Sequence, residues 1–170
     1  AHVNKADRNG QTPLHVASYW GSTDAVTALL SSGAALEAWA PGVRMTPLHW
    51  ACSQGHVEAA RALLAAGAAL EARDAGERTP LHFASVRGHE DVVQALLVGC
   101  ASHAATIQLR VTPLQMAAEK GFAPVIRALV AAGAAVEAQA DEKRLTALHG
   151  ASALGHIEAI EALVAATASP

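Results

Sequence analysis

Histidine is the residue type in this chain whose abundance invites a catalytic or metal-binding interpretation. The 170 residues include nine histidines and two cysteines. A neutral imidazole can act as a general base near pH 7 and is a common zinc ligand. The positions are regular, however. Four histidines follow Thr-Pro-Leu or Thr-Ala-Leu (His15, His49, His82 and His149), three directly follow a glycine (His56, His89 and His156), and two stand outside both sets (His2 and His103).

None of these residues has the spacing that a catalytic or metal motif requires. His89-Glu90-Asp91 lacks the second histidine, four residues after the first, that a zinc-binding helix needs. The chain has no Cys-x-x-Cys, no glycine-rich phosphate loop and no Gly-x-Ser-x-Gly elbow. Cys100 and His103 could form a metal or redox pair, although a local irregularity of the sequence pattern explains them better. We therefore predict no catalytic residue, no metal, no cofactor and no enzymatic activity.

The regular spacing of the histidines comes from an internal repeat. Thr12, Thr46, Thr79, Thr112 and Thr146 each begin a similar stretch, at intervals of 34, 33, 33 and 34 residues. A glycine follows nine residues after each threonine, and an apolar pair such as Leu29-Leu30 follows eight residues later. Thr before Pro is a helix N-cap with proline at the first helical position, and the glycine can end that helix in a left-handed conformation. Each stretch thus predicts two helices and a connecting finger, which must stack on neighbours to bury their apolar faces.

This pattern resembles the ankyrin repeat family over essentially the whole chain. The resemblance rests on Thr12-Pro-Leu-His15 and its four relatives, on Gly-His pairs such as Gly55-His56, and on Gly33-Ala34-Ala35-Leu36 with its counterparts. It implies an all-α repeat solenoid, an ankyrin-type stack of antiparallel helix pairs with short β-hairpin fingers. It also implies that histidines of the first set hydrogen-bond the capping threonine and nearby backbone. The expected single domain, 1–170, divides into units at about 6–38, 39–72, 73–105, 106–138 and 139–170.

Two departures from the family pattern predict local irregularity. The glycine that usually stands two residues before the threonine is present only as Gly10, and its equivalents are Arg44, Glu77, Arg110 and Arg144; fingers two and five also carry one extra residue, as the 34-residue spacings require. Both facts call the standard tight finger turn into question there. In the third unit, Cys100 replaces the closing glycine, and His103 replaces the Leu or Val of other units. The junction between units three and four is therefore expected to be irregular.

Composition and charge narrow the class of partner and the compartment. Twelve basic and fifteen acidic side chains leave a formal charge of −3, which argues against nucleic acid or an anionic membrane as partner. The apolar runs fall far short of the ~20 residues that cross a bilayer. Two isolated cysteines fit a reducing compartment. We expect an intracellular chain, cytoplasmic or nuclear, that is monomeric as a fragment. Residues 1–5 resemble the tail of a preceding repeat, so we also expect a longer parent protein.

The resemblance implies that the first helices and fingers form a concave surface that binds other proteins. Four of the six aromatic residues fall on the first-helix row, and a fifth, Trp39, on an adjoining finger. Trp, Tyr and Arg are enriched in binding hot spots. We predict a non-catalytic protein–protein interaction module that binds a protein or peptide. The predicted contact residues are Arg8, Gln11, Tyr19, Trp20, Trp39, Arg44, Met45, Trp50, Ser53, Gln54, Arg78, Phe83, Val86, Arg87, Glu119 and Lys120.

Two alternatives stay open from the sequence. An aromatic patch around Trp50 could box a methylated lysine, because aromatic faces attract cations. In that arrangement, the plausible nearby acids are Asp24 and Glu58. The chain could also be a passive spacer within a larger scaffold protein.

Overall fold

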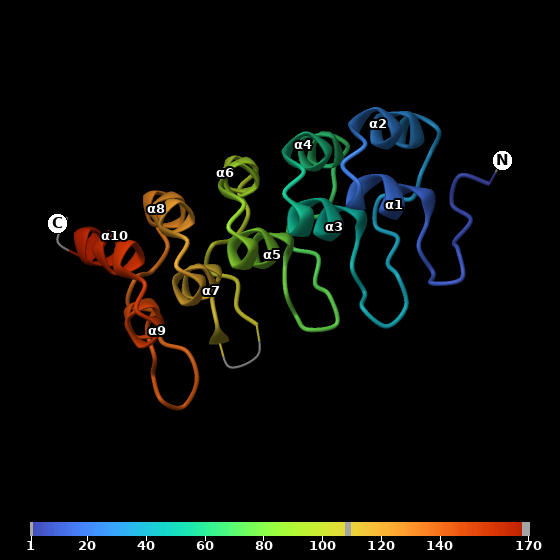
Figure 1. Cartoon of the computed structure of the whole chain (residues 1–170). Coiled ribbons are helices and arrows are strands. Elements are labelled where there is room, and N and C mark those ends of the chain that lie inside the picture. Colours follow the sequence, from blue (N-terminus) through green and yellow to red (C-terminus); the bar gives the residue numbers. More distant parts are fainter. Residues whose placement is uncertain (1, 108–109, 168–170) are drawn as a thin grey trace.

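Each repeat of the sequence folds as a pair of short helices (Figure 1). The computed structural model describes residues 2–107 and 110–167, and within these ranges it contains ten helices. The first helices of the pairs are α1 (Pro13–Tyr19), α3 (Pro47–Gln54), α5 (Pro80–Arg87), α7 (Pro113–Lys120) and α9 (Ala147–Leu154). The second helices are α2 (Thr23–Ser31), α4 (Val57–Ala65), α6 (Glu90–Val98), α8 (Ala123–Ala131) and α10 (Ile157–Thr167).

The pairs stack into two rows of helices. Each first helix packs on the next first helix, and each second helix packs on the next second helix. Figure 1 shows the two rows one above the other, with the finger loops projecting beyond the first-helix row. The predicted all-α repeat stack is therefore confirmed.

Small side chains allow the first helices to pack closely. The fifth residue after each capping threonine is an alanine, and all five are buried (Ala17, Ala51, Ala84, Ala117 and Ala151). The second helices of units two to five each supply a leucine at the same position of the repeat, and these leucines are fully buried (Leu63, Leu96, Leu129 and Leu163). The core is consequently a continuous seam between units, as stacking of incomplete units requires.

The capping threonine and the histidine after it fix the start of each first helix. In α3, Thr46 is extended (φ −83°, ψ 167°) and its backbone N–H donates to His49 Nδ1 at 3.1 Å. Thr46 Oγ1 lies 2.9 Å from the same nitrogen. His49 Nε2 lies 3.1 Å from the carbonyl oxygen of Arg78, in the next finger. One buried imidazole thus caps its own helix and bonds the following unit. Gln115 takes this place in α7, and its Oε1 accepts from Thr112 N at 2.9 Å.

The third finger keeps the tight turn of the first finger without glycine, so the expectation of an altered turn is wrong there. The second and fifth fingers, which are one residue longer, close differently: Ala40 N donates to Met45 O and Ala140 N donates to Leu145 O, five residues on, whereas Asp7 N donates to Gln11 O, four residues on. The expectation is confirmed for these two fingers. Arg44, Glu77, Arg110 and Arg144 have φ values of 53°, 62°, 61° and 56°, in the left-handed region that Gly10 also occupies (φ 76°). Local hydrogen bonds hold this conformation in place. In the third finger, Asp74 N donates to the carbonyl oxygen of Arg78 at 3.0 Å.

In the described residues, the fingers do not form the β-hairpins that the sequence predicts. Within the described ranges the chain has no strand, and its isolated β-bridge joins Ala140 to Leu145. This single pair of residues does not extend into a ladder of strand hydrogen bonds.

The loop that closes unit three has a regular backbone at Cys100, so no irregularity of the backbone follows from the missing glycine. Cys100 adopts the left-handed conformation of the missing glycine (φ 66°). Its N–H donates to Leu97 O at 2.9 Å, and Ala101 N donates to Leu96 O at 3.0 Å. Equivalent bonds follow α2, where Gly33 N donates to Leu30 O at 3.0 Å. The same two backbone carbonyls therefore hold the loop with cysteine at position 100 as with Gly33 in the first unit.

Candidate functional site

Three aromatic side chains meet where α1 and α3 pack together. The ring of Tyr19 contacts Trp20 edge-on, with centroids 5.2 Å apart, and contacts Trp50 in the same manner at 5.4 Å. Trp20 is 70% exposed, and Tyr19 is 37% exposed. Trp50 is half-buried, and its Nε1 atom is buried with no hydrogen-bond partner in the described part of the chain. Trp50 therefore supports the cluster, while Trp20 offers most of its indole to solvent.

The second finger carries a further exposed indole. Trp39 is 56% exposed, and the guanidinium carbon of Arg44 lies 5.8 Å from the centroid of its ring. A cation within about 6 Å of a Trp face is attracted by the ring electrons. Arg44 thus holds its charge beside an aromatic surface. We refer to Tyr19, Trp20, Trp39, Arg44 and Trp50 as the aromatic surface.

Phe83 is not part of the available surface, because Arg78 covers it. The Arg78 guanidinium carbon lies 4.4 Å from the centroid of the Phe83 ring, His49 packs edge-on at 5.7 Å, and Phe83 is 7% exposed. Phe83 therefore fills space between neighbouring first helices.

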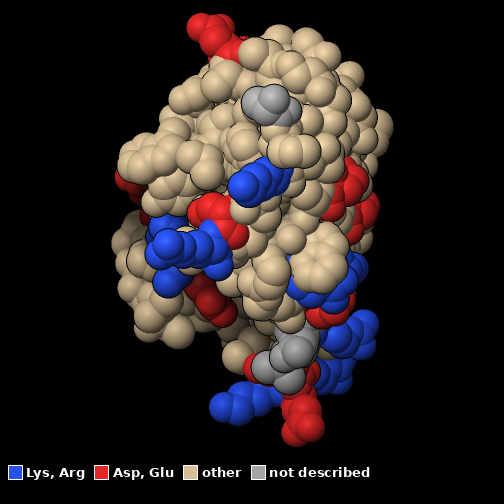
Figure 2. Space-filling view, turned by 90° about the vertical axis from the view of Figure 1, so that its right-hand side faces the viewer, with Lys and Arg blue, Asp and Glu red and all other residues tan. Residues whose placement is uncertain are grey.

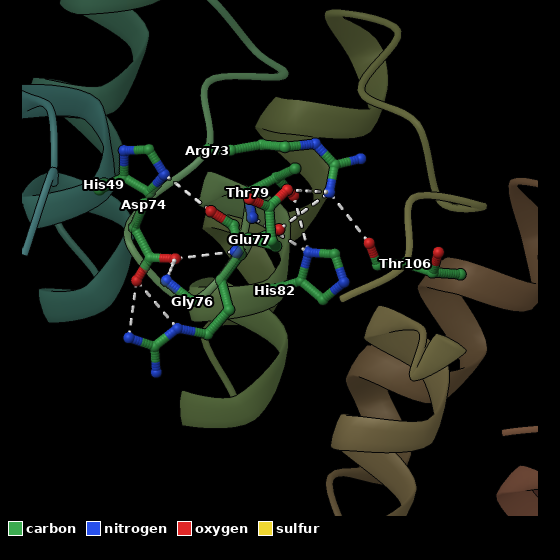
Figure 3. Close-up of polar contacts among 9 residues, drawn as sticks. His49, Arg73, Asp74, Gly76, Glu77, Thr79, His82 and Thr106 are labelled. Carbon is green, nitrogen blue, oxygen red and sulfur yellow. Dashed lines mark hydrogen bonds and ion pairs between the residues drawn. The ribbon is translucent and has the colours of Figure 1, made fainter. Parts of the chain in front are cut away.

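Asp74 fixes Arg78 in this position. Asp74 Oδ2 accepts from Arg78 Nη2 at 2.7 Å and from Nε at 3.0 Å, and Oδ1 accepts from the N–H groups of Gly76 and Arg78 (Figure 3). Burial of Asp74 acts to raise the pKa of its carboxyl, but the hydrogen bonds and charge of Arg78 outweigh burial and leave this pKa below its ordinary value. These bonds brace the third finger, and Arg78 is already engaged within the chain.

The structure sorts the sixteen predicted contact residues by exposure. Eight are exposed: Arg8, Tyr19, Trp20, Trp39, Arg44, Arg87, Glu119 and Lys120. Five are half-buried: Gln11, Trp50, Gln54, Arg78 and Val86. Three are buried and cannot meet a partner in this conformation: Met45, Ser53 and Phe83.

An apolar hollow lies beside Trp20 and is lined by residues that the sequence reasoning missed; it lies on the face of the first unit whose equivalents in the second unit, Ala59 and Leu63, are fully buried. Its volume is about 430 Å³, and it lies between α1 and α2, lined by Trp20, Val16, Ala25 and Leu29 among others. Figure 2 shows this end of the molecule, where uncharged residues cover the upper part and charges of both signs gather toward the fingers. One signal was visible in the sequence: Val16 stands where the next three units have Trp50, Phe83 and Met116.

Comparison with known families identifies the repeat. The family model described as Ankyrin repeats (3 copies) matches residues 36–110 and 99–170, and the model described as Ankyrin repeat matches residues 9–39. The chain belongs to the ankyrin repeat family. A search of curated protein sequences finds no match to the chain.

In this ankyrin repeat chain the seven regularly spaced histidines have structural partners. Four of them follow the capping threonine, and in each the Nδ1 atom lies 2.9 Å from the Oγ1 atom of that threonine (His15, His49, His82 and His149). The three after the glycine bond a carbonyl oxygen of the preceding first helix (His56, His89 and His156). Residues 2–107 and 110–167 contain no group of three or more His, Cys, Asp or Glu arranged to hold a metal ion. The same ranges contain no helix that is long and apolar enough to cross a membrane.

Burial favours the neutral form of three of the capping histidines, His15, His49 and His82. It lowers the pKa of His15 and His49, and it lowers that of His82 to about 4, with carbonyls of Val111 and Ala105 opposing the shift. These imidazoles are hydrogen-bonded within the ankyrin stack and turned away from solvent, which suits a capping role and not proton exchange with a substrate.

Proposed function

We propose that this ankyrin repeat chain is a non-catalytic module that binds a protein or peptide through the aromatic surface. Ankyrin repeats generally serve as protein–protein interaction modules, and the family assignment supports this class of function. The observation that carries the site is the exposure of two indoles, 70% for Trp20 and 56% for Trp39. Trp20 lies beside the apolar hollow, and large exposed aromatic side chains gain most from burial against a partner.

Charge complementarity supports the same location. Arg44 stands against Trp39 and Arg8 is exposed on the first finger, whereas Arg78 is held by Asp74. A partner segment that combines an apolar side chain for the hollow with an acidic residue for Arg44 would suit this arrangement. Acidic rim contacts add mainly to association rate and orientation.

Affinity capture with matched variants tests the proposal. The wild-type chain, Trp20→Ala/Trp39→Ala and Val98→Ala are compared as baits, after circular dichroism shows that all three fold. Val98 is 84% exposed on α6, so its variant removes an exposed apolar side chain from the other row. We expect a protein that wild type and Val98→Ala retain and the double variant loses by at least tenfold. Retention by all three baits would refute the aromatic surface as the binding site.

No observation favours the methyl-lysine alternative over this proposal. Phe83, one possible wall of a cage, already carries the Arg78 cation on its face. Tyr19 and Trp50 remain, packed edge-on against each other. Titration with mono-, di- and trimethyl-lysine peptides, followed by tryptophan fluorescence, distinguishes the two functions. The spacer alternative predicts that no substitution on the aromatic surface changes any binding.

The remaining expectations from the sequence stay proposals. We infer a reducing, intracellular compartment because Cys52 and Cys100 are both free, the first buried and the second exposed. We also infer a monomeric, non-enzymatic chain without cofactor.

A further inference from the structure

At three successive junctions of the stack, a backbone N–H donates a hydrogen bond to a side-chain oxygen of the preceding loop. Ala35 N donates to Asn4 Oδ1 at 2.7 Å, Ala69 N donates to Glu37 Oε1 at 2.8 Å, and Ser102 N donates to Glu71 Oε1 at 2.7 Å. The three acceptors occupy the same position of the repeat, directly after Val3, Leu36 and Leu70. A side-chain oxygen at this position therefore bridges one unit to the next.

The junction between units three and four lacks this oxygen. Ala104 stands at the acceptor position, directly after His103, and its methyl group cannot accept a hydrogen bond. The N–H of Ala135, which is equivalent to those of Ala35 and Ala69, has no hydrogen-bond partner within residues 2–107 and 110–167. A hollow of about 220 Å³ opens here, lined by His103, Ala104, Ala135 and Arg110 among others. The missing side chain thus leaves both an unpaired donor and a space.

The groups around this hollow suit an anion. Arg110 is exposed and forms no ion pair with any described residue. The imidazole of His103 lines the same wall, at a position where other units have Leu or Val. No Asp or Glu is among the lining residues. A guanidinium, an imidazole and a free backbone N–H together present donors and positive charge to one small volume, and such donors form strong hydrogen bonds with anionic oxygens. A carboxylate is the anion that fills the equivalent place at the two preceding junctions, through Glu37 and Glu71.

We propose that this hollow binds the carboxylate of a glutamate side chain from a partner polypeptide, in the place that Glu37 and Glu71 occupy at the two preceding junctions. The polypeptide nature of the ligand rests on the proposed function, but the hollow shares no residue with the aromatic surface. The two sites can therefore succeed or fail separately.

Nuclear magnetic resonance of the uniformly ¹⁵N-labelled chain tests the site with a generic probe. The probe is the blocked tripeptide acetyl-Gly-Glu-Gly-amide at millimolar concentration, and its glutamine counterpart is the matched control. We expect the glutamate peptide to shift the backbone amide signals of Ala135 and Arg110 in a saturable manner, with at least tenfold weaker binding of the glutamine peptide. Equal responses to both peptides, or no response, would overturn the proposal. An equal response to inorganic phosphate would also overturn it, because the hollow would then be a general anion site.

Variants identify the position of the carboxylate. Ala104→Glu supplies the missing side chain, so we expect the Ala135 amide signal to shift without peptide and to lose its response to peptide. Ala75→Glu adds the same charge at an exposed alanine of the third finger and should keep the full response. Trp20→Ala/Trp39→Ala should keep it as well, so loss of partner capture by that variant leaves this proposal intact. Persistence of the response in Ala104→Glu would place the peptide elsewhere and contradict the assignment.

Discussion

The capping histidine shows how much one side chain contributes to the start of a helix in each repeat. His82 lies fully buried, with Nδ1 accepting from the N–H of Thr79 at 3.2 Å. Protonation would remove that acceptor and place a charge in the core. The equivalent position in unit four is filled by Gln115, whose Oε1 accepts from Thr112 N and whose Nε2 donates to Leu145 O. A neutral amide therefore makes both of the bonds that the cap requires.

We predict that acid destabilises the chain partly through His82 and that His82→Gln reduces this effect. The pKa of His82 is lowered to about 4 in the folded chain, chiefly by burial, whereas an unfolded histidine titrates near pH 6.5. As the pH falls from about 6.5 to about 4, the unfolded state binds a proton that the folded state excludes, so stability is complete above this range and decreases within it. At pH 5 the loss from His82 is on the order of 2 kcal/mol. Urea unfolding of wild type and His82→Gln at pH 7 and pH 5 measures it. An equal loss of stability in both proteins would contradict the prediction.

At the scale of the helix pair, the glycine between two helices joins the pair to its neighbour. Gly88 has φ +77°, and a Cβ at that position would lie 2.7 Å from the ring of Phe122 in the next unit. Gly155 has nearly the same conformation, φ +71°, but a Cβ there meets no atom within 4 Å. The two positions share the same backbone requirement, and contact with a following unit distinguishes them.

Alanine at these two glycines should therefore have unequal effects. Gly155→Ala adds the strain of a left-handed non-glycine residue, about 1–2 kcal/mol. Gly88→Ala adds the same strain and also forces the Phe122 ring to move, with a further cost of about 1–3 kcal/mol that is typical of overpacking. The free energies of unfolding from urea titration give the difference directly. If the two variants lose equal stability, the contact between Gly88 and Phe122 does not help to hold the units together.

The elements could be predicted from the sequence better than their loops and surfaces. The Thr-Pro-Leu-His spacing predicts all five first helices, because capping and proline placement act locally. The tight turn of the third finger could not be predicted, because the left-handed conformation of Glu77 depends on hydrogen bonds that close the finger and not on side-chain preference. The altered turns of the second and fifth fingers follow from their extra residue, which the sequence shows. The burial of Phe83 likewise depends on where Asp74 directs Arg78. Ala104 was visible in the sequence as a departure from Glu37 and Glu71, but its meaning required the hydrogen bonds of the other junctions.

In the described part of the chain, the helices that pack most closely belong to the same unit or to neighbouring units. Units in the middle are covered on both sides, whereas α10 leaves Ile157 64% exposed and Val164 49% exposed. In such a stack, stability is approximately a sum of unit terms and nearest-neighbour interface terms. Local opening should therefore cost least at the ends. The aromatic surface lies on the first two units and not at the middle of the stack.

Hydrogen exchange should reveal both this gradient and its change on binding. We predict that helix-interior amides of α5 and α6 exchange at least tenfold more slowly than those of α9 and α10, which corresponds to about 1.4 kcal/mol of additional opening free energy. Amide exchange followed by nuclear magnetic resonance, at two pH values that establish the equilibrium regime, measures these energies helix by helix. Uniform protection along the chain would show that the stack opens as one unit and would contradict the prediction. A partner captured through Trp20 and Trp39 should then raise protection in α1 to α4 more than in α9 and α10, because binding stabilises the units that it contacts.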